Sequence, residues 1–440
     1  MLIFIENTPR AYAWGSRDAL PDMLGTAPNG EPQAELWLGT HPGSPAHVAK
    51  ATPQAHTLID LVESDPERYG VDGGPLPFLL KVLAIGAPLS LQVHPDSGQA
   101  EAGFAAEEAA GIPRDARHRN YGDRRHKPEL LVALGDVTAL SGFRALPAVR
   151  RDLALLAAAV RHCDDRVDSG AGGEAGERAE RAEYGGADAL DRVADRLAGD
   201  DGERRRELLQ WAFSGDPVVG RALRALQRVI AEGDAEAAGL DPERAAALRE
   251  LVAAHPGDPG VLVSLLLHLV HLAPGEAIFL RARQLHAYLS GIAVEVMASS
   301  DNVLRAGLTE KHVDVAELCR IVDTDELDDP RFPCTRSARG LVAWCPDVPD
   351  FRLLRARLCD PDDDSLARVD DGAPLVEVPA EHPLVLVVTA GRVRVERAAA
   401  DAEALAEVAT ARRGQSLYVS AGEPVRLTGH GEVFLATVGG

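Results

Sequence analysis

The chain has 440 residues, a formal net charge of −22 at pH 7 and an aromatic content of only 4%. This length exceeds what a single hydrophobic core usually supports, so the sequence predicts two or three domains. The excess of acidic residues argues against nucleic acid or an anionic membrane as a partner, because both require a dense basic surface. Arginine supplies nearly all of the positive charge, and the few lysines are Lys50, Lys81, Lys127 and Lys311. Each lysine is therefore a candidate for a position that requires an amine.

Residues 1 to about 100 are rich in glycine and proline and contain short apolar runs such as Phe78–Leu83 and Leu89–Val93. These runs predict strands joined by tight turns. Between Leu146 and His255, alanine, arginine, glutamate and leucine dominate, and apolar residues recur at helical spacing. This pattern predicts helices over three segments: 202–213, 216–232 and 242–254. The Gly-, Glu- and Arg-rich residues 165–189 predict a solvated loop.

Short β-branched runs return after the helical part and predict further strands. They are Glu276–Leu280, Ala293–Met297, Leu384–Val388, Val393–Glu396, Ser416–Val419 and Val433–Thr437. The sequence thus predicts a mainly β fold, in which one β domain is interrupted by a helical insertion and followed by a second β domain. The expected boundaries are 1–145 and 257–320 for the first β domain, 146–256 for the insertion and 321–440 for the second β domain.

The cysteines and the apolar segments indicate the compartment. The five cysteines (Cys163, Cys319, Cys334, Cys345 and Cys359) include no CxxC pair, which predicts reduced thiols rather than disulfides or a zinc ribbon. The N-terminus lacks the basic and apolar segments of a signal peptide. The most apolar stretch, Val261–Leu272, is shorter than the roughly 20 residues that span a bilayer. We therefore expect a soluble, cytoplasmic protein.

Four polar residues in or next to predicted strands form a candidate metal site. Gln92 and His94 alternate, so both side chains point to one face of a strand. Glu129 begins an apolar run, and His286 follows a glycine turn and a strand. These nitrogen and oxygen ligands suit Zn²⁺, or less selectively another divalent metal, with one position left open for water. Taken singly, each histidine is more often a surface or core residue than a ligand.

Five blocks of the sequence resemble, in the same order, the type I mannose-6-phosphate isomerases of the cupin superfamily. They are Ala34–Pro42 (AELWLGTHP), Pro88–Asp96 (PLSLQVHPD), Asn120–Leu130 (NYGDRRHKPEL), His286–Gly291 (HAYLSG) and Val294–Lys311 (VEVMASSDNVLRAGLTEK). The resemblance implies two cupin-like β (jelly-roll) domains, with a helical domain inserted in the first. It also implies a zinc-dependent aldose–ketose isomerase that interconverts D-mannose 6-phosphate and D-fructose 6-phosphate through an enediol intermediate.

The resemblance also implies roles for individual residues, matched position by position. The implied ligands of one Zn²⁺ per chain are Gln92, His94, Glu129 and His286. Arg305 matches an active-site arginine, and Glu295 and Lys127 match groups considered for proton transfer. Ser90 and Lys311, together with Arg305, match positions that hold the phosphate of the sugar.

The chemistry of isomerisation requires a base near C1 and C2 and a group that stabilises the enediolate oxygens. A Lewis-acid metal, helped by a guanidinium such as Arg305, meets the second requirement. Glu295 qualifies as the base because it is a carboxylate, and Lys127 qualifies if its pKa is depressed. An ion pair in which Lys127 orients Glu129 is an equally good interpretation. The sequence therefore does not decide between Glu295 and Lys127.

Two places depart from the cupin pattern. Arg281 and Arg283 stand where the turn before the last ligand usually has proline and glycine, and long residues tolerate a positive φ poorly, so we expect a changed turn. Their positive charges could also help to attract a phosphate. In the C-terminal domain Gly414 keeps a similar turn, but Val425 stands where a ligand histidine would fall. We therefore expect that domain to be structural and to lack metal ligands.

Two alternatives to the isomerase are a non-catalytic sugar-binding cupin and a cupin-type metal oxygenase. The intact ligand set with Arg305 and Glu295 argues against the first, and Gln92 as a ligand argues against the second. His268 and His271 have helical spacing within a predicted apolar helix, but no carboxylate accompanies them, so they are weaker metal ligands. We expect a small phosphosugar as the partner, no nucleic acid or membrane, and a monomer or weak homo-oligomer.

Overall fold

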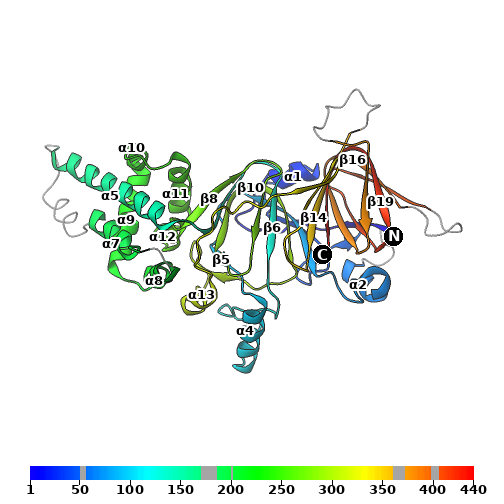
Figure 1. Cartoon of the computed structure of the whole chain (residues 1–440), viewed down its shortest axis with the longest axis horizontal. Helices are drawn as coiled ribbons and strands as arrows, with labels where there is room; N and C mark the ends of the chain where they lie inside the picture. Colours follow the sequence, from blue (N-terminus) through cyan, green and yellow to red (C-terminus); the bar gives the residue numbers. More distant parts are fainter. Residues whose placement is uncertain (50–55, 170–185, 200–201, 360–371, 398–405) are drawn as a thin grey trace.

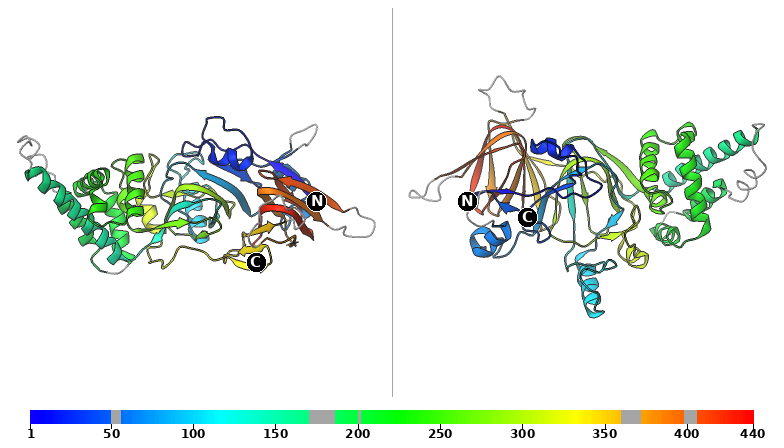
Figure 2. Two further views of the ribbon diagram at one scale, coloured as in Figure 1. Left: turned by 90° about the horizontal axis from the view of Figure 1, so that it is seen from above. Right: turned by 180° about the vertical axis from the view of Figure 1, so that it is seen from behind.

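The computed structural model describes residues 1–49, 56–169, 186–199, 202–359, 372–397 and 406–440. Two antiparallel β-sheets lie next to each other, and a cluster of helices forms the end of the molecule beyond one of them (Figure 1). Both chain termini lie at the other end, with the second sheet (Figure 2). In the described ranges no helix is both long enough and apolar enough to cross a membrane.

Nine strands of the described chain form the sheet next to the helices. They are β2 (Glu35–Leu38), β4 (Phe78–Ile85), β5 (Gln92–Val93), β6 (Glu129–Ala133), β7 (Val137–Phe143), β8 (Leu267–Leu272), β9 (Ala277–Leu280), β10 (His286–Ala298) and β11 (Leu304–Arg305). Strand β10 is central, because it pairs with β5 and β7 through its first residues and with β4 and β6 through its last. A single strand therefore connects the two halves of this sheet.

Strand β4 is buried along its whole length, which explains its almost continuous apolar sequence. Leu80 and Val82 on one face belong to the core between the two sheets. Leu83 and Ile85 on the other face belong to the interior of the nine-stranded sheet. Lys81, the one charged residue of β4, alternates with Leu80 and Val82 and thus faces that interior. A charge placed there requires partners.

Ten strands of the described chain form the second sheet. They are β1 (Leu2–Glu6), β3 (His47–Val48), β12 (Thr335–Ala338), β13 (Leu341–Trp344), β14 (Arg352–Leu358), β15 (Leu375–Ala380), β16 (Leu384–Arg397), β17 (Glu407–Arg412), β18 (Ser416–Val419) and β19 (Gly422–Thr437). The N-terminal strand β1 pairs with β18, so the start of the chain joins the C-terminal sheet. The sequence pattern did not indicate this pairing, because it connects segments far apart in the chain.

Most strands predicted from the sequence are confirmed as parts of β4, β9, β10, β16, β18 and β19. Two of the predicted runs, Leu384–Val388 and Val393–Glu396, belong to the single long strand β16. The run Leu89–Val93 forms a strand only at Gln92–Val93. The remaining described helices outside the helical cluster are α1 (Ala19–Leu24), α2 (Leu58–Ser64), α3 (Pro66–Tyr69), α4 (Ser97–Ala109) and α13 (Val315–Ile321).

Helices occupy the described chain between β7 and β8 (Figures 1 and 2). They are α5 (Leu146–Ser169), α7 (Gly186–Arg196), α8 (Gly202–Ala212), α9 (Pro217–Glu232), α10 (Asp234–Ala237), α11 (Pro242–Ala254) and α12 (Gly260–Ser264). The three helices predicted from spacing are confirmed as α8, α9 and α11. Asp216 and Asp241 begin two of them, because each caps the first turn and is followed by a proline. Of the loop expected over 165–189, residues 170–185 lie outside the described part, and the flanks belong to α5 and α7.

The prediction that His268 and His271 lie on an apolar helix is wrong. Helix α12 ends at Ser264, and strand β8 carries both histidines. A short apolar run is compatible with a helix or a strand, and its periodicity does not separate them. Nε2 of His268 lies 2.6 Å from the carbonyl oxygen of Leu327, and Nδ1 of His271 lies 3.2 Å from Oγ1 of Thr138. Both histidines are thus held by other groups, away from the candidate metal ligands.

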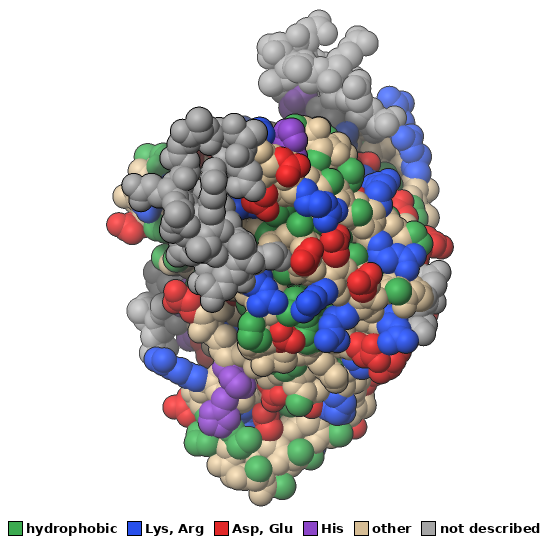
Figure 3. Space-filling view, turned by 90° about the vertical axis from the view of Figure 1, so that its left-hand side faces the viewer, with side chains coloured by type: hydrophobic (Ala, Val, Ile, Leu, Met, Phe, Trp, Pro, Cys, Tyr) green, Lys and Arg blue, Asp and Glu red, His purple; other side chains and the backbone are tan. Residues whose placement is uncertain are grey.

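The helical end of the molecule carries many of the charges. Seen from that end, acidic and basic side chains are interspersed over the described surface (Figure 3). The apolar faces of the helices are buried in one cluster, which extends from Leu156 and Leu226 to residues of the nine-stranded sheet such as Val93 and Leu304. The helical cluster therefore shares its core with the strands that carry the candidate site, and its outer surface is solvated.

Candidate metal centre

Three side chains converge inside the nine-stranded sheet. Nε2 of His94 lies 3.2 Å from Oε1 of Glu129, and Nε2 of His286 lies 3.5 Å from Oε2 of the same carboxylate. All three residues are buried, and their ligand atoms lie within 4.8 Å of one another. Two imidazoles and one carboxylate at these distances can hold a divalent metal ion.

The hydrogen bonds of the two histidines leave one nitrogen of each free for a metal. Nδ1 of His94 lies 2.7 Å from the carbonyl oxygen of Asn302, and Nδ1 of His286 lies 3.0 Å from that of Gln284. A carbonyl oxygen only accepts, so each Nδ1 donates its proton, and in a neutral ring Nε2 then carries the lone pair. Nε2 of His94 is buried and makes no hydrogen bond. Metal-binding histidines show this arrangement, in which a backbone carbonyl fixes the ring.

The ionisation of these residues also fits a metal. Burial, reinforced by the positive charge of Lys127, lowers the pKa of His94 to about 4 and keeps the ring neutral. Burial alone would raise the pKa of Glu129, but the positive charge of Lys127, whose Nζ lies 2.8 Å from Oε1, outweighs this effect and lowers the pKa well below its usual range. The site therefore presents a neutral imidazole at His94 and an ionised carboxylate at Glu129, as metal binding requires.

Gln92 and Arg305 lie in the same row of the sheet as His286. In the antiparallel pairing of β5, β10 and β11, Gln92 is directly opposite His286 on one side and Arg305 on the other. Side chains of directly paired residues point to the same face. The structure thus places the amide of Gln92 beside the three converging ligands and the guanidinium of Arg305 one strand further away.

A second group of buried charges lies beside the ligands. Nζ of Lys81 lies 3.2 Å from Oε2 of Glu295 and 3.8 Å from Oε2 of Glu35, and its ammonium stands 4.9 Å from the ring centre of Trp37. Burial disfavours the ammonium, but the carboxylates of Glu35, Glu295 and Glu129 outweigh this effect and raise the pKa of Lys81. Lys81 therefore lies in the site as a permanent cation.

Tyr288 connects the two groups. Its hydroxyl oxygen lies 3.1 Å from Oε1 of Glu295 and 3.4 Å from Oε2 of Glu129. Burial and the charge of Glu295 raise the pKa of Tyr288 well above its ordinary value, so the phenol stays protonated and donates. Burial also raises the pKa of Glu295, although Lys81 opposes this effect. Glu295 is thus held by a phenol on one oxygen and an ammonium on the other.

A β-bulge in β10 makes this contact possible. Tyr288 and Glu295 are seven residues apart, an odd number, and such residues point to opposite faces of a regular strand. The register with β7 shifts between Tyr288 and Ser290, and Gly291 has a φ of +118°. The extra residue at this bulge returns Glu295 to the face of Tyr288.

Arg305, whose backbone pairs with Gln92, and the exposed Lys311 form a pair of cations. In the described part of the chain neither side chain has an ion-pair partner. Burial lowers the pKa of Arg305, and burial followed by the positive charge of Arg305 lowers the pKa of Lys311, so the two cations are close enough to repel each other. Ser90 precedes Leu91, whose backbone pairs with residues 306 and 307 directly after Arg305. Unpaired cations beside a polar residue are suited to bind an anion.

Comparisons with known proteins identify relatives over most of the chain. The model of the type I phosphomannose isomerase catalytic domain matches residues 2–146. The mannose-6-phosphate isomerase of Escherichia coli K12 is 39% identical over 320 residues, which cover 71% of this chain and 72% of that protein. The mannose-6-phosphate isomerase of Emericella nidulans is 32% identical over 434 residues, with 89% and 86% covered. The chain belongs to the type I phosphomannose isomerase family.

Solved structures of this family share the whole fold. A zinc-bound mannose 6-phosphate isomerase superposes with a TM-score of 0.80 at 30% identity and covers 100% of this chain and 99% of that chain. A variant of phosphomannose isomerase from Salmonella typhimurium superposes with a TM-score of 0.80 at 29% identity, with the same coverage. The β-rich architecture with two antiparallel sheets is therefore that of the phosphomannose isomerases.

Two residues of the candidate site were not singled out from the sequence. Glu35 pairs with Lys81, and the carbonyl of Asn302 orients His94. The lone Lys81 in an apolar strand was the available signal for the buried charges. No local signal marks a backbone carbonyl as a partner of a histidine. Of the lysines expected to occupy special positions, Lys81 and Lys127 are buried beside the candidate ligands, Lys311 is exposed, and Lys50 lies outside the described residues.

The turn before His286 differs from the expectation. Residues 281–284 form a turn closed by a hydrogen bond from the N–H of Gln284 to the carbonyl of Arg281. Arg283 itself has a φ of +72°, so the long residue adopts the left-handed conformation that the sequence reasoning excluded. This conformation costs a non-glycine residue about 1 kcal/mol or more, and neighbouring contacts must compensate for it. The side chain of Arg281 is exposed.

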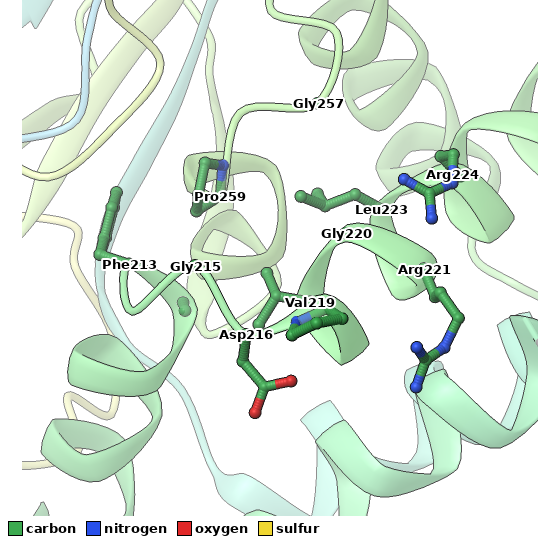
Figure 4. A pocket seen from close by; sticks show the side chains of 12 residues that line it. Phe213, Gly215, Asp216, Val219, Gly220, Arg221, Leu223, Arg224, Gly257 and Pro259 are labelled. Carbon is green, nitrogen blue, oxygen red and sulfur yellow. The ribbon is translucent and has the colours of Figure 1, made fainter.

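A separate hollow of about 610 Å³ lies in the helical cluster, between the end of α8, the start of α9 and the loop at Gly257 (Figure 4). Phe213, Asp216 and Arg221 are among the residues that line it. None of the candidate ligands or phosphate-binding residues of the phosphomannose isomerase family contributes to it. The candidate site thus depends on the strands of the nine-stranded sheet rather than on this hollow.

Proposed function

We propose that the chain interconverts D-mannose 6-phosphate and D-fructose 6-phosphate and that it holds one Zn²⁺ through Gln92, His94, Glu129 and His286. The observation that carries this proposal is the convergence of two carbonyl-oriented imidazoles on one ionised carboxylate. The names of the relatives and the zinc-bound structural neighbour support it.

The described charges are compatible with a divalent cation. Glu35, Glu129 and Glu295 face Lys81 and Lys127, so the buried residues carry one more negative than positive charge when all are ionised. Buried charges are stable only when they are balanced. Zn²⁺ bound here would act as a Lewis acid that polarises the carbonyl group of the open-chain sugar.

The residues around the metal ligands would bind and orient the substrate. We propose that Ser90, Lys311 and Arg305 hold the phosphate, because two cations without carboxylate partners favour a doubly charged anion. The guanidinium of Arg305, in the same row as Gln92 and His286, would also stabilise the negative oxygen of the enediolate. The acidic surface of the chain contributes nothing to the capture of this anion, so local cations must do so.

The proton transfer between C1 and C2 is assigned to Lys127 or Glu295. Both oxygens of Glu295 are already engaged, one by Tyr288 and one by Lys81. Lys127 has one ion-pair partner among the described residues, Glu129, so its amine is the less engaged of the two groups. We therefore propose that Lys127, after its ammonium has released a proton, is the group that moves the proton between C1 and C2. Exchange of the substrate C2 hydrogen with deuterated solvent tests this: Lys127→Met should abolish exchange, and Glu295→Gln should slow it less.

The domain organisation proposed with this function follows the sequence boundaries. Residues 1–145 and 257–320 would form the catalytic cupin domain, 146–256 the helical insertion, and 321–440 a cupin-like jelly roll without metal ligands. A cytoplasmic location and a monomeric or weakly associated state remain predictions. Size-exclusion chromatography with light scattering measures the oligomeric state.

A coupled assay that detects fructose 6-phosphate formed from mannose 6-phosphate tests the proposed reaction. The zinc-loaded protein should turn over, a strong chelator should abolish turnover, and added zinc should restore it. If freshly zinc-loaded protein binds mannose 6-phosphate but gives no turnover, the alternative of a non-catalytic sugar-binding cupin is correct and the isomerase proposal is wrong.

A further inference from the structure

We propose that Arg283 is a positioning residue of the metal centre, which holds His94 and His286 relative to each other by anchoring the turn 281–284 to helix α13. This inference rests on the metal centre proposed above. It assigns to Arg283 a role that neither the motif blocks nor the spacing of the ligands indicates.

The turn contacts both histidines through its backbone. The N–H of Arg283 donates to the carbonyl oxygen of His94 at 2.6 Å. The carbonyl of the next residue, Gln284, accepts from Nδ1 of His286 at 3.0 Å. The position of residues 283 and 284 therefore sets the backbone of one ligand and the ring orientation of the other. A shift of this turn would separate the two imidazoles.

The side chain of Arg283 holds the turn in place. Its Nε donates to the carbonyl oxygen of Ile321 at 3.0 Å, and its own carbonyl accepts from the N–H of Asp323 at 2.9 Å. Ile321 is the last residue of helix α13, where carbonyl groups lack intrahelical partners and the helix dipole is negative. A guanidinium at this position satisfies an orphan carbonyl and is attracted by the dipole. These contacts compensate for the left-handed backbone of Arg283.

The anchor is itself fixed by the helical cluster. On helix α8, Nε of Arg206 donates to the carbonyl of Cys319, and a guanidinium nitrogen of Arg205 donates to the carbonyl of Thr324 at 3.0 Å. Both acceptors lie within three residues of Ile321. The chain of contacts therefore runs from α8 through α13 and Arg283 to the ligands. A rigid support of this kind keeps metal ligands in their productive geometry.

An electrostatic role is the competing explanation, because Arg281 and Arg283 place two charges beside a phosphate-binding site. The two explanations predict different effects of substituting Arg281 and Arg283. The exposed Arg281 carries the same charge in the same turn but makes no contact with α13 in the described chain. An electrostatic role predicts similar effects at both positions, whereas anchoring predicts an effect at Arg283 alone.

Zinc affinity of the full-length protein, measured by competition with a chromophoric chelator, tests the inference. Arg283→Met removes the donor and keeps the bulk, and it should weaken zinc binding by roughly ten- to a hundredfold. Arg283→Gln places an amide nitrogen where Nε was and should bind zinc nearly as tightly as the wild type. Arg281→Met is the matched control and should leave zinc affinity unchanged. At saturating zinc, Arg283→Met should keep the wild-type KM for mannose 6-phosphate.

Thermal unfolding of the zinc-free proteins shows whether each variant folds. If Arg283→Met does not fold, Arg283→Gly replaces it, since glycine adopts a positive φ readily and lacks the donor. Wild-type zinc affinity in the donor-free variant, or an equal loss in Arg281→Met, would overturn the inference while leaving the metal centre intact. Failure of the wild type to bind zinc in the same titration would refute the metal centre and, with it, the role of Arg283.

Discussion

The two sheets differ most in the kinds of side chain that they bury. The hydrophobic core of the ten-stranded sheet consists of leucine, valine and alanine, including Val425, and Arg397, at the end of β16, is the buried charged residue among its described strands. The interior of the nine-stranded sheet combines apolar residues with His94, Glu129, His286 and Lys81. Aliphatic side chains stabilise a fold when buried, whereas buried charges cost stability unless each is paired. The ten-stranded sheet therefore contributes mainly to the stability of the fold. The nine-stranded sheet is less stabilising, because it buries the charged side chains of the site.

This contrast shows that the site is a property of particular side chains and not of the sheet itself. Both sheets are antiparallel and have long central strands, β10 in one and β16 and β19 in the other. Substitutions in matched pairs, one in each sheet, therefore separate the chemistry of the site from the stability of the fold.

The largest expected effect is that of His286→Ala. Loss of this imidazole should empty the metal centre, and because a bound metal contributes several kcal/mol to charge stabilisation, kcat/KM should fall by about a thousandfold or more. Metal analysis and the coupled assay measure both effects. The matched control Val425→Ala truncates the corresponding position of the other sheet and should lower the melting temperature without changing the zinc content. Zinc retained at the wild-type level in His286→Ala would show that the ligand assignment is wrong.

Arg305→Ala should keep the zinc and lose turnover. Removal of a group that stabilises a developing oxyanion typically costs about a hundred- to a thousandfold in kcat. The comparison with His286→Ala is decisive, since only the histidine variant should lose metal. Lys311→Gln should mainly raise the KM for mannose 6-phosphate, because it removes a phosphate contact. Normal turnover in Arg305→Ala would show that Arg305 does not take part in the reaction.

Much of the site was visible in the sequence because its residues belong to short motifs with regular spacing. Gln92 and His94 are two residues apart, with His94 directly after β5, and Glu129 and His286 head apolar runs that form β6 and β10. The buried network around Lys81 was not predictable in the same way. Its partners Glu35 and Glu295 lie 46 residues before and 214 residues after Lys81 in the chain and meet only through the pairing of β2, β4 and β10.

The fold was predictable to a similar degree. Alternating and helical patterns identified most strands and the helices α8, α9 and α11, since these patterns reflect one buried face. The pairing of β1 with β18 and the strand conformation of His268 and His271 were missed. Both depend on which distant segment packs against the residue, and a local pattern does not contain that information. The positive φ of Arg283 was missed for the same reason, because Ile321 and Asp323 hold it.

Lys81→Met should destabilise the protein more than a similar change in the other sheet. Without the ammonium, the carboxylates of Glu35 and Glu295 lose their buried partner, and breaking such a pair costs about 3 kcal/mol. Urea unfolding of the zinc-free protein measures this loss. The matched control Leu427→Met, in the aliphatic core of the ten-stranded sheet, should cost less than about 1.5 kcal/mol, because the volume is nearly conserved. Equal losses would contradict the ionic role of Lys81.

The smallest expected effect concerns the pH dependence of stability at His268. Burial lowers the pKa of His268 in the folded protein, so the unfolded chain takes up this proton first as the pH falls. The stability contribution of the neutral ring is thus present above the ordinary histidine pKa of about 6.5 and is lost below it. His268→Gln should reduce the loss of stability between pH 8 and pH 5.5 by less than about 1 kcal/mol. His430→Gln, in the ten-stranded sheet, is the control. If it reduced the pH-dependent loss of stability equally, the effect would not be specific to His268.

The bulge in β10 makes the length of this strand as important as its composition. Val294 and Val296, on either side of Glu295, pack in the core between the two sheets. If one residue between Tyr288 and Glu295 were deleted, every following side chain would change face: a valine would meet Lys81, and the carboxylate would enter the hydrophobic contact. The face to which each residue after the bulge points therefore depends on the exact length of strand β10. A substitution of one residue in β10 changes the contacts of that residue. A change of length by one residue moves every following side chain to the opposite face of the sheet.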